Sequence, residues 1–284
     1  MTKPTSAAAP YLALPAIELA AADGARAAIT LQGAHVVSWT PARGSERLFL
    51  SSKAEYAPGQ AIRGGIPVIF PQFAGEGPLP KHGFARTATW KFDGIEQDAR
   101  GYGIARFSLT NEQATHSLWP HRYVATLVVV VGGDTLTVTL GVRNAGPKSI
   151  SFTAALHSYL RVSDIALAQV IGLDGLHYRD AANGNALKIA DIGPVEISGE
   201  FDRIYFNAPA QLVLREQGRD LHVSSDGFPD AVVWNPGTVK GAALSDLEPG
   251  GYARFLCIEA AAIGKPVKLA AGAEWAGSQT LRAG

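Results

Sequence analysis

Short runs of apolar and β-branched residues, separated by glycine, proline, asparagine or aspartate, recur along most of the chain. The clearest pair is YVATLVVVV (123–131) and TLTVTLGV (135–142), with Gly132, Gly133 and Asp134 between them. These turn residues allow the positive φ angles that a tight connection needs. The pattern therefore predicts a β-hairpin over residues 123–142.

Seven further segments have the same β-rich character, whereas long helical periodicity is nearly absent. Many antiparallel strands at short spacing predict a sandwich or a barrel, and their number exceeds the seven or so strands of a small sandwich. The sequence therefore predicts an all-β protein built on a large sheet system. The seven segments are 25–40, 103–110, 149–162, 211–216, 219–225, 230–235 and 252–261.

The length of the chain favours one large domain at least as much as two smaller ones. It has 284 residues, and all-β domains of about 200–250 residues are common. No shift in composition marks a boundary. We therefore expect a flexible N-terminal tail over residues 1–14 and a single domain over residues 15–284.

Charge and cysteine content narrow the partners and the compartment. The chain has 25 basic and 25 acidic residues, so we expect neither nucleic acid nor an anionic membrane as a partner. Its single cysteine, Cys257, can form no internal disulfide, which suits a reducing compartment. No apolar run reaches the roughly 18 residues of a membrane span. We expect a cytoplasmic monomer that acts on a small molecule.

Several familiar chemistries lack their sequence motifs. The chain contains no GxxxxGK[ST] phosphate loop, no GxGxxG unit between a strand and a helix, no GxSxG elbow and no HExxH. His116 and His121 flank Trp119 and Pro120 at a spacing that suits no zinc motif, and we interpret them as surface histidines. No metal site is predicted.

Two polar residues stand inside apolar strands. His157 lies in FTAALHSYLRV, and it enters either a cavity or a packed core in which the backbone satisfies its ring. Glu259 lies in RFLCIEAAAIG, where an unpaired buried carboxylate costs several kcal/mol. Such a carboxylate needs a partner or a chemical role, so both residues are candidates for function.

The segment RGGIPVIFPQFAGEGPLPKHGFAR (63–86) places Arg63, His82 and Arg86 around a loop rich in glycine and proline. If residues 82–86 are extended, His82 and Arg86 share a face and lie about 13 Å apart, enough to contact both ends of a hexose phosphate. Arginines held in this way suit a bidentate contact with an anion. The alternative is a rigid connection that carries two solvated arginines.

The chain resembles the glucose-6-phosphate 1-epimerase branch of the aldose 1-epimerase family. The resemblance rests on IRGGIPVIFPQFAGEGPLPKHGFAR, LHSYLRV, FDRIYFN, VVWNPG and FLCIEAA, in this order, and spans roughly residues 15 to 282. It implies a galactose mutarotase-like fold, which is a large antiparallel β-supersandwich with the sugar in a cleft on one concave sheet. It also implies interconversion of hexose 6-phosphate anomers without cofactor or metal.

The same resemblance implies the roles of individual residues. His157 matches the general acid that protonates the ring oxygen, and Glu259 matches the base that removes the proton of the anomeric hydroxyl. The sugar opens, rotates about the C1–C2 bond and recloses with the two roles reversed. The substrate-binding residues that we expect are His82 near the ring oxygen, Asp202 at sugar hydroxyls, and Arg63 and Arg86 at the 6-phosphate. Gln72 is a further candidate for substrate binding, either through a direct contact or from behind the residues that touch the sugar.

Two other functions remain open from the sequence. A mutarotase for unphosphorylated aldoses would not need both arginines, and Glu76 in the loop is an acid that weakens the preference for a phosphate if it lies close to it. A non-catalytic sugar-binding protein is the other alternative, although both His157 and Glu259 are present. Trp234 and Asn235 match the family motif VVWNPG, and we expect Trp234 to pack beneath the site.

Overall fold

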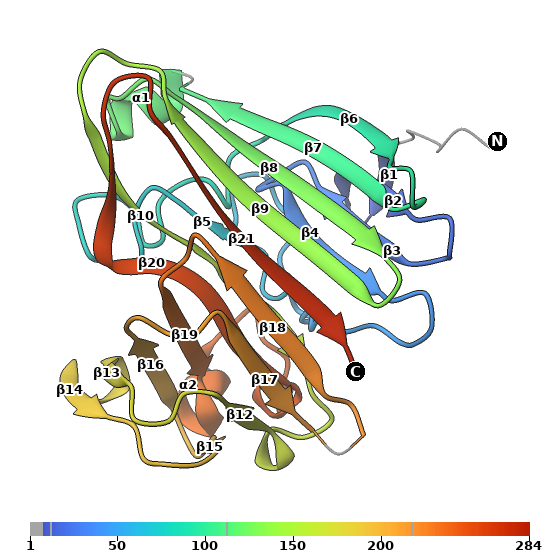
Figure 1. The fold of residues 1–284 in the computed structure, drawn as a ribbon, viewed down its shortest axis with the longest axis vertical. Coiled ribbons are helices and arrows are strands. Elements are labelled where there is room, and N and C mark those ends of the chain that lie inside the picture. Colours follow the sequence, from blue (N-terminus) through green and yellow to red (C-terminus); the bar gives the residue numbers. More distant parts are fainter. Residues whose placement is uncertain (1–7, 12, 112, 217) are drawn as a thin grey trace.

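The computed structural model describes residues 8–11, 13–111, 113–216 and 218–284, and strands dominate it (Figure 1). In these residues the strands form three antiparallel sheets, so the predicted all-β class is confirmed. The helical segments are short, and none of those described has the length and apolar character to cross a membrane. They are α1 (Gln113–Leu118), α2 (Gly237–Ala243), η1 (Ile165–Leu167), η2 (Ala181–Asn183) and η3 (Gly251–Arg254).

The largest sheet has nine strands and contains the predicted hairpin. Strands β8 and β9 pair from Tyr123 with Asn144 to Gly132 with Thr135, which leaves Gly133 and Asp134 in the turn. Burial alternates along both strands, as in a sheet with one face covered. In sheet order the strands are β15 (Val195–Glu196), β12 (Gln169–Ile171), β17 (Gln211–Arg215), β18 (Leu221–Asp226), β21 (Glu274–Ala283), β9 (Thr135–Asn144), β8 (Tyr123–Gly132), β7 (Gly103–Thr110) and β6 (Lys91–Gln97).

A second sheet has eight strands, and its strand β20 is covered on both faces. The first nine residues of β20 are all buried, without the alternation of a half-exposed strand. In sheet order the strands are β14 (Ala186–Ile189), β13 (His177–Asp180), β16 (Phe201–Tyr205), β19 (Asp230–Asn235), β20 (Phe255–Leu269), β10 (Ile150–Leu156) and β5 (Val68–Ile69), while β11 (Tyr159–Arg161) also pairs with β20.

The third sheet has four strands and includes part of the expected tail. Ala8–Tyr11 forms β1 and pairs with β2, while residues 1–7 and 12 of the expected tail lie outside the described residues. The four strands, in sheet order, are β1 (Ala8–Tyr11), β2 (Leu14–Ala20), β3 (Arg26–Thr30) and β4 (His35–Thr40).

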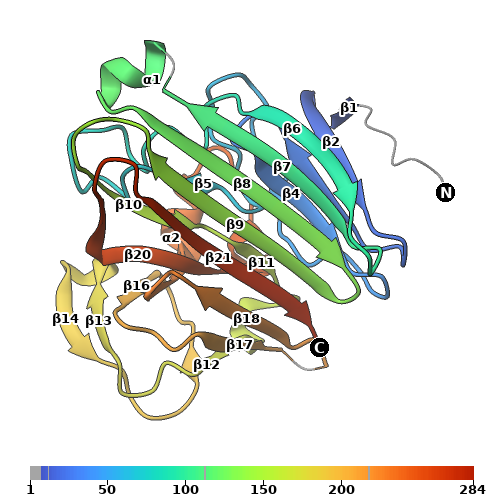
Figure 2. The ribbon, with the colours of Figure 1, turned by 45° about the horizontal axis from the view of Figure 1, so that its top comes forward.

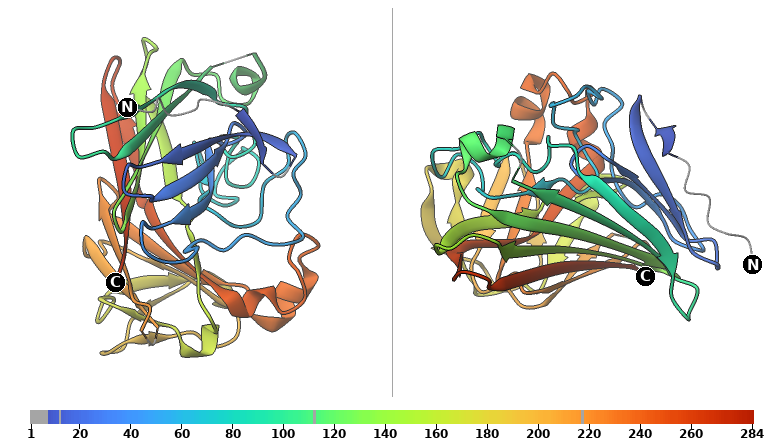
Figure 3. Two further views of the ribbon diagram at one scale, coloured as in Figure 1. Left: turned by 90° about the vertical axis from the view of Figure 1, so that its right-hand side faces the viewer. Right: turned by 90° about the horizontal axis from the view of Figure 1, so that it is seen from above.

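One hydrophobic core joins the three sheets. Its buried side chains include Leu127 of β8, Val138 of β9, Val36 of β4, Val233 of β19 and Ile258 of β20. Figures 2 and 3 show β7, β8, β9 and β21 side by side in one curved layer that belongs to the nine-stranded sheet, with the strands of the four-stranded sheet on one side of it. Because side chains alternate along β19 and β20, the residues next to these core positions point to the opposite face of the eight-stranded sheet.

Candidate active site

Six of the seven residues that we expected at the site line a single cavity over the eight-stranded sheet. The cavity has a volume of about 510 Å³, which is typical of sites for small ligands. The fold thus gathers residues from loops and strands that are far apart in the sequence. The six residues are Arg63, His82, Arg86, His157, Asp202 and Glu259.

The registers between strands build the floor of this cavity. Asp202 of β16 is the partner of Trp234 in β19, Trp234 is the partner of Cys257 in β20, and Cys257 is the partner of Tyr159 in β11. Directly opposed residues share one face of a sheet, so these four side chains form one row. Glu259 follows Cys257 by two positions and therefore points to the same face.

His157 and Glu259 are in direct contact on this floor. His157 lies between β10 and β11, and its Nε2 is 3.3 Å from Oε1 of Glu259. The imidazole ring stacks on Tyr159 with 4.9 Å between the ring centres and 10° between the planes, which restricts its orientation. The second carboxylate oxygen of Glu259, Oε2, is buried and has no hydrogen-bond partner among the described residues. The hydrogen-bonding capacity of this oxygen is therefore unused by the described residues.

Burial and neighbouring charges determine the protonation of the pair. Burial lowers the pKa of His157 well below its usual 6.5, and the charges of His82, Arg86 and Arg63 lower it further. Burial also raises the pKa of Glu259 well above its usual 4.5, and the charge of Asp202 adds to this effect. These opposite directions favour a state in which the pair holds one proton, and without a ligand the carboxyl holds it.

The backbone turns sharply at His82 and Gly83, which corrects the extended conformation considered for residues 82–86. Both residues have a φ of 68°, in the left-handed region. A Cβ atom on Gly83 would lie 2.2 Å from the carbonyl oxygen of Phe70, so only glycine fits. The turn brings the imidazole of His82 to 5.8 Å from that of His157, measured between ring centres.

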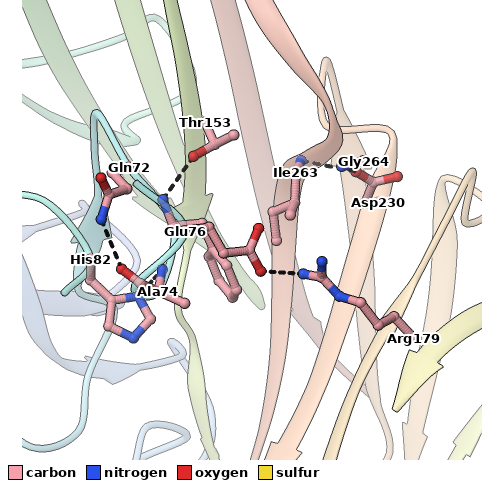
Figure 4. Close-up of polar contacts among 10 residues, drawn as sticks. Gln72, Ala74, Glu76, His82, Thr153, Arg179, Asp230, Ile263 and Gly264 are labelled. Carbon is pink, nitrogen blue, oxygen red and sulfur yellow. Dashed lines mark hydrogen bonds and ion pairs between the residues drawn. The ribbon is translucent and has the colours of Figure 1, made fainter. Parts of the chain in front are cut away.

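The tautomer of His82 follows from its contact with the loop backbone. The amide N–H of Ala74 donates to Nδ1 of His82 at 3.3 Å (Figure 4). Because Nδ1 accepts a hydrogen bond, this contact assigns the ring proton to Nε2. Burial, followed by the charges of Arg86 and Lys81, lowers the pKa of His82 to about 3. His82 is therefore a neutral ring at neutral pH, and its Nε2–H can act as a hydrogen-bond donor.

Gln72 lies away from the cavity. Its Nε2 donates to the carbonyl oxygens of Ala74 and Leu79 at 3.2 and 3.1 Å, and its Oε1 accepts from the amide of Leu79 at 3.0 Å. The side chain lines a neighbouring depression behind the loop. The amide of Gln72 thus holds residues 74–79 in shape, a role that its sequence position did not reveal.

The two arginines have different surroundings. Arg63 donates through Nε to Oδ2 of Asp246 at 3.1 Å and through Nη1 to the hydroxyl of Tyr159 at 3.0 Å. Arg86 donates through Nη2 to the carbonyl oxygen of Lys81 at 3.0 Å, and its Nε is buried without a partner among the described residues. Burial lowers the pKa of Arg86 because the charged form is costly there. This end of the cavity is therefore suited to an anion.

Comparison with known proteins identifies the family to which this chain belongs. The family model described as aldose 1-epimerase matches residues 15–282. The chain is a member of the aldose 1-epimerase family. A Cenchrus ciliaris protein, provisionally named glucose-6-phosphate 1-epimerase, is 36% identical over 267 residues, which are 90% of this chain and 81% of that protein. An Escherichia coli K12 protein with the same provisional name is 34% identical over 240 residues, covering 83% of this chain and 79% of that protein.

A solved structure supports the fold of this aldose 1-epimerase family member. The crystal structure of a Salmonella typhimurium protein, provisionally called a mutarotase, matches it with a TM-score of 0.85 and 30% sequence identity. The match covers 91% of this chain and 87% of that chain. The mutarotase-like fold implied by the sequence resemblance is therefore confirmed.

In this member of the aldose 1-epimerase family, the tryptophan of the VVWNPG motif lines the cavity and the asparagine holds the framework beside it. Trp234 lines the cavity, and its ring lies edge-on to His157 with 5.7 Å between ring centres. Asn235 is buried, and its Nδ2 donates to the carbonyl oxygens of Tyr252 and Phe255 at 2.9 and 2.8 Å. It thereby joins the end of β19 to η3 and β20.

Glu76 lies at the cavity and forms an ion pair with Arg179 of β13 (Figure 4). The negative charge of Glu76, which we considered as unfavourable for phosphate binding, is thus neutralised by Arg179. The pair also links the loop that carries His82 to the far edge of the eight-stranded sheet.

Several residues around the cavity escaped the sequence interpretation. Tyr159, Lys81 and Lys240 line it, and Asp246 pairs with Arg63 behind it. Tyr159 follows His157 by two positions in a strand, so alternation was a usable signal for its shared face. The other three lie in loops or on the short helix α2, where no periodic pattern marks the inner face.

Proposed function

We propose that this protein interconverts the α and β anomers of a hexose 6-phosphate, with D-glucose 6-phosphate as the leading substrate. The observation that carries the proposal is the contact between His157 and Glu259 at 3.3 Å in a cavity that also contains Arg63 and Arg86. The provisional names of the curated relatives support the same substrate class.

The reaction needs one proton removed and one delivered at neighbouring oxygens. The proton of the pair first moves from Glu259 to His157 across their contact. Oε2 of Glu259 then takes the proton of the anomeric hydroxyl, and protonated His157 delivers its proton to the ring oxygen, which breaks the bond between that oxygen and C1. Both oxygens are bonded to C1, so two groups in contact with each other are well placed to reach them. The ring opens to the aldehyde.

The reverse transfers complete the exchange. After rotation about the C1–C2 bond, His157 recovers the proton of the C5 hydroxyl and Glu259 returns its proton to the carbonyl oxygen as the ring closes. The pair holds one proton before opening and one after it, so the protein returns to its starting state without any other reactant. The mechanism thus needs one proton on the pair. Burial also favours one proton on the pair, because it lowers the pKa of His157 and raises the pKa of Glu259.

The remaining residues hold the sugar in this proposal. His82 donates its Nε2–H to a sugar oxygen near the ring oxygen, and Asp202 accepts hydrogen bonds from hydroxyl groups. Arg63 and Arg86 bind the 6-phosphate through charge-assisted hydrogen bonds. Gln72 has its amide engaged by the loop, so we propose that it supports His82 indirectly. The reaction requires no metal or cofactor, and we propose that it occurs in the cytoplasm.

A mutarotase for unphosphorylated aldoses is the second candidate. The observation in its favour is the ion pair of Arg63 with Asp246, with Nη2 of Arg63 3.1 Å from Oδ2, because this carboxylate already neutralises one of the two cations. A non-catalytic sugar-binding protein would bind sugar without anomer exchange.

Magnetisation-exchange NMR on glucose 6-phosphate, glucose and galactose distinguishes the three functions. We expect the exchange between anomers to be accelerated most for glucose 6-phosphate, and Glu259→Gln to remove most of the acceleration. Equal efficiency with free glucose would favour the second candidate. Exchange at the uncatalysed rate for every sugar, in a protein that binds them, would refute catalysis altogether.

A further inference from the structure

Within the described part of the chain, Asp246 forms its side-chain hydrogen bond and ion pair with Arg63. Its Oδ2 accepts a hydrogen bond from Nε of Arg63 at 3.1 Å and lies 3.1 Å from Nη2, so one oxygen faces two nitrogens of the guanidinium. The side chains of both residues are about one-fifth exposed, which makes this contact less screened than an ordinary surface ion pair.

The opposite side of the same guanidinium contacts Tyr159 on the floor of the cavity. Nη1 of Arg63 donates to the hydroxyl of Tyr159, whose ring stacks on His157. The guanidinium has five N–H donors, so one on Nη2 and one on Nη1 remain for the oxygens of an anion. Two different partners therefore fix the plane of the group while part of its donor set stays free.

The loop that carries Asp246 is itself anchored to the neighbouring loop. It connects α2 to η3, and Glu248 two positions later accepts hydrogen bonds from the hydroxyl of Ser51 at 2.5 Å and from the amide of Ser52 at 3.1 Å. Glu248 also forms an ion pair with Arg254. This anchoring gives Asp246 a defined position from which it can orient a long side chain.

An arginine side chain loses up to about 2 kcal/mol of rotamer freedom when it is ordered. If the protein has already restricted the guanidinium, an incoming phosphate does not have to restrict it again. We propose that Asp246 is the positioning residue for Arg63, and that it sets the affinity for the 6-phosphate of the substrate without taking part in ring opening. This inference rests on the proposed function.

Two substitutions at position 246 separate orientation from charge. Asp246→Leu keeps the branched shape of the side chain but removes the acceptor, so Arg63 loses its orienting partner. Asp246→Asn removes the negative charge but retains one oxygen that can accept from Nε and lie against Nη2, since Oδ2 alone contacts both nitrogens in the native protein. The asparagine variant also removes a charge that repels the phosphate.

Steady-state anomer exchange is measured for both variants with glucose 6-phosphate and with glucose. Asp246→Leu is expected to raise KM for glucose 6-phosphate about tenfold, with kcat and the rate on glucose changed less than twofold. Asp246→Asn is expected to remain within about threefold of the native KM. Asp226→Asn is the control for the loss of one negative charge, because Asp226 is exposed on β18 and belongs to the nine-stranded sheet rather than to the sheet that carries the cavity.

A double-mutant cycle adds a readout that a purely structural role would not produce. If Asp246 acts through Arg63, then Arg63→Ala and the double variant Arg63→Ala, Asp246→Leu have the same KM. Equal losses with both sugars, a lowered kcat, or additive effects in the cycle would overturn the proposal. If Asp246→Leu does not fold, Asp246→Asn tests the proposal by itself. A tenfold rise in the KM of this variant for glucose 6-phosphate would contradict the orienting role of the remaining oxygen.

Calorimetric binding of glucose 6-phosphate separates this inference from the proposed function. A native protein that binds the sugar phosphate without exchanging its anomers would refute the proposed catalysis. The effect of Asp246→Leu on the measured Kd would still test the positioning role. Unchanged binding in that variant would refute the positioning role and leave the catalysis intact.

Discussion

Replacement of Arg86 by methionine is expected to change stability and substrate binding in opposite directions. The Nε of Arg86 is buried without a partner among the described residues, and its Nη2 donates to a backbone carbonyl oxygen rather than to a carboxylate. Burial lowers the pKa of this group. The folded protein therefore bears a desolvation cost that a bound phosphate would offset.

The two magnitudes follow from the same contacts. Methionine has a similar length and no charge, and removing a partly buried cation that lacks a carboxylate partner is expected to stabilise the fold by about 1 kcal/mol. In a protein of this size that corresponds to a rise in Tm of about 2 °C. Loss of a charge-assisted contact of about 1.5–3 kcal/mol should raise KM for glucose 6-phosphate about 10–150-fold.

Thermal unfolding and anomer exchange measure these two effects in parallel. Arg86→Lys is the control that keeps the charge, so it should give no gain in Tm and recover only part of the affinity, because lysine lacks the planar fork. Exchange of free glucose should change little with either variant, since the arginine contacts lie away from the reacting carbon.

A lower Tm for Arg86→Met would refute this reasoning, as would equal losses of activity with glucose and glucose 6-phosphate. Either result would mean that Arg86 supports the loop from Lys81 to Arg86 rather than an anion.

Three further predictions concern the acid–base pair and the loop. His157→Asn and Glu259→Gln should each lower kcat about 10²-fold or more in NMR exchange assays, and the double variant should lose less than the product of the two. The pH profile of kcat/KM should be flat around neutrality. Activity falls in acid only where His157, with its lowered pKa, takes up the second proton of the pair, and in base only where Glu259, with its raised pKa, gives up the last one. Gly83→Ala should destabilise the fold by about 2 kcal/mol or more in thermal unfolding, because its Cβ would lie 2.2 Å from the carbonyl oxygen of Phe70.

Each of these predictions has a clear contrary result. Near-native kcat in folded Glu259→Gln would require a different base. An activity loss centred near the ordinary histidine pKa of 6.5 would mean that burial does not control His157. Gly24→Ala is the control for the loop, since Gly24 also has a positive φ, of 95°, but a Cβ atom added there would have no atom of the described residues within 4 Å. Equal losses at Gly24 and Gly83 would show that φ strain alone matters.

Local patterns in the sequence were sufficient for several of the strands and for singling out His157 and Glu259, whereas the roles of acid and base came from the family resemblance. The hairpin over 123–142 was predicted because alternation and turn residues act over a few positions. His157 and Glu259 were noticed because a polar group inside an apolar strand must find a partner or a function. The family motifs, in their order along the chain, indicated the fold. Periodicity alone did not distinguish a sandwich from a barrel.

Only the tertiary structure decided which side chains meet. Arg63 contacts Asp246 across 183 positions of sequence, and Gln72 is engaged by its own loop instead of the cavity. The turn at His82 depends on the close approach of Gly83 to the backbone of Phe70. Alternation predicts which residues share one face of a strand. It does not predict which other strand pairs with that strand, or in which register the two strands pair. Those choices depend on packing over the whole sheet, and in this protein they determine the site.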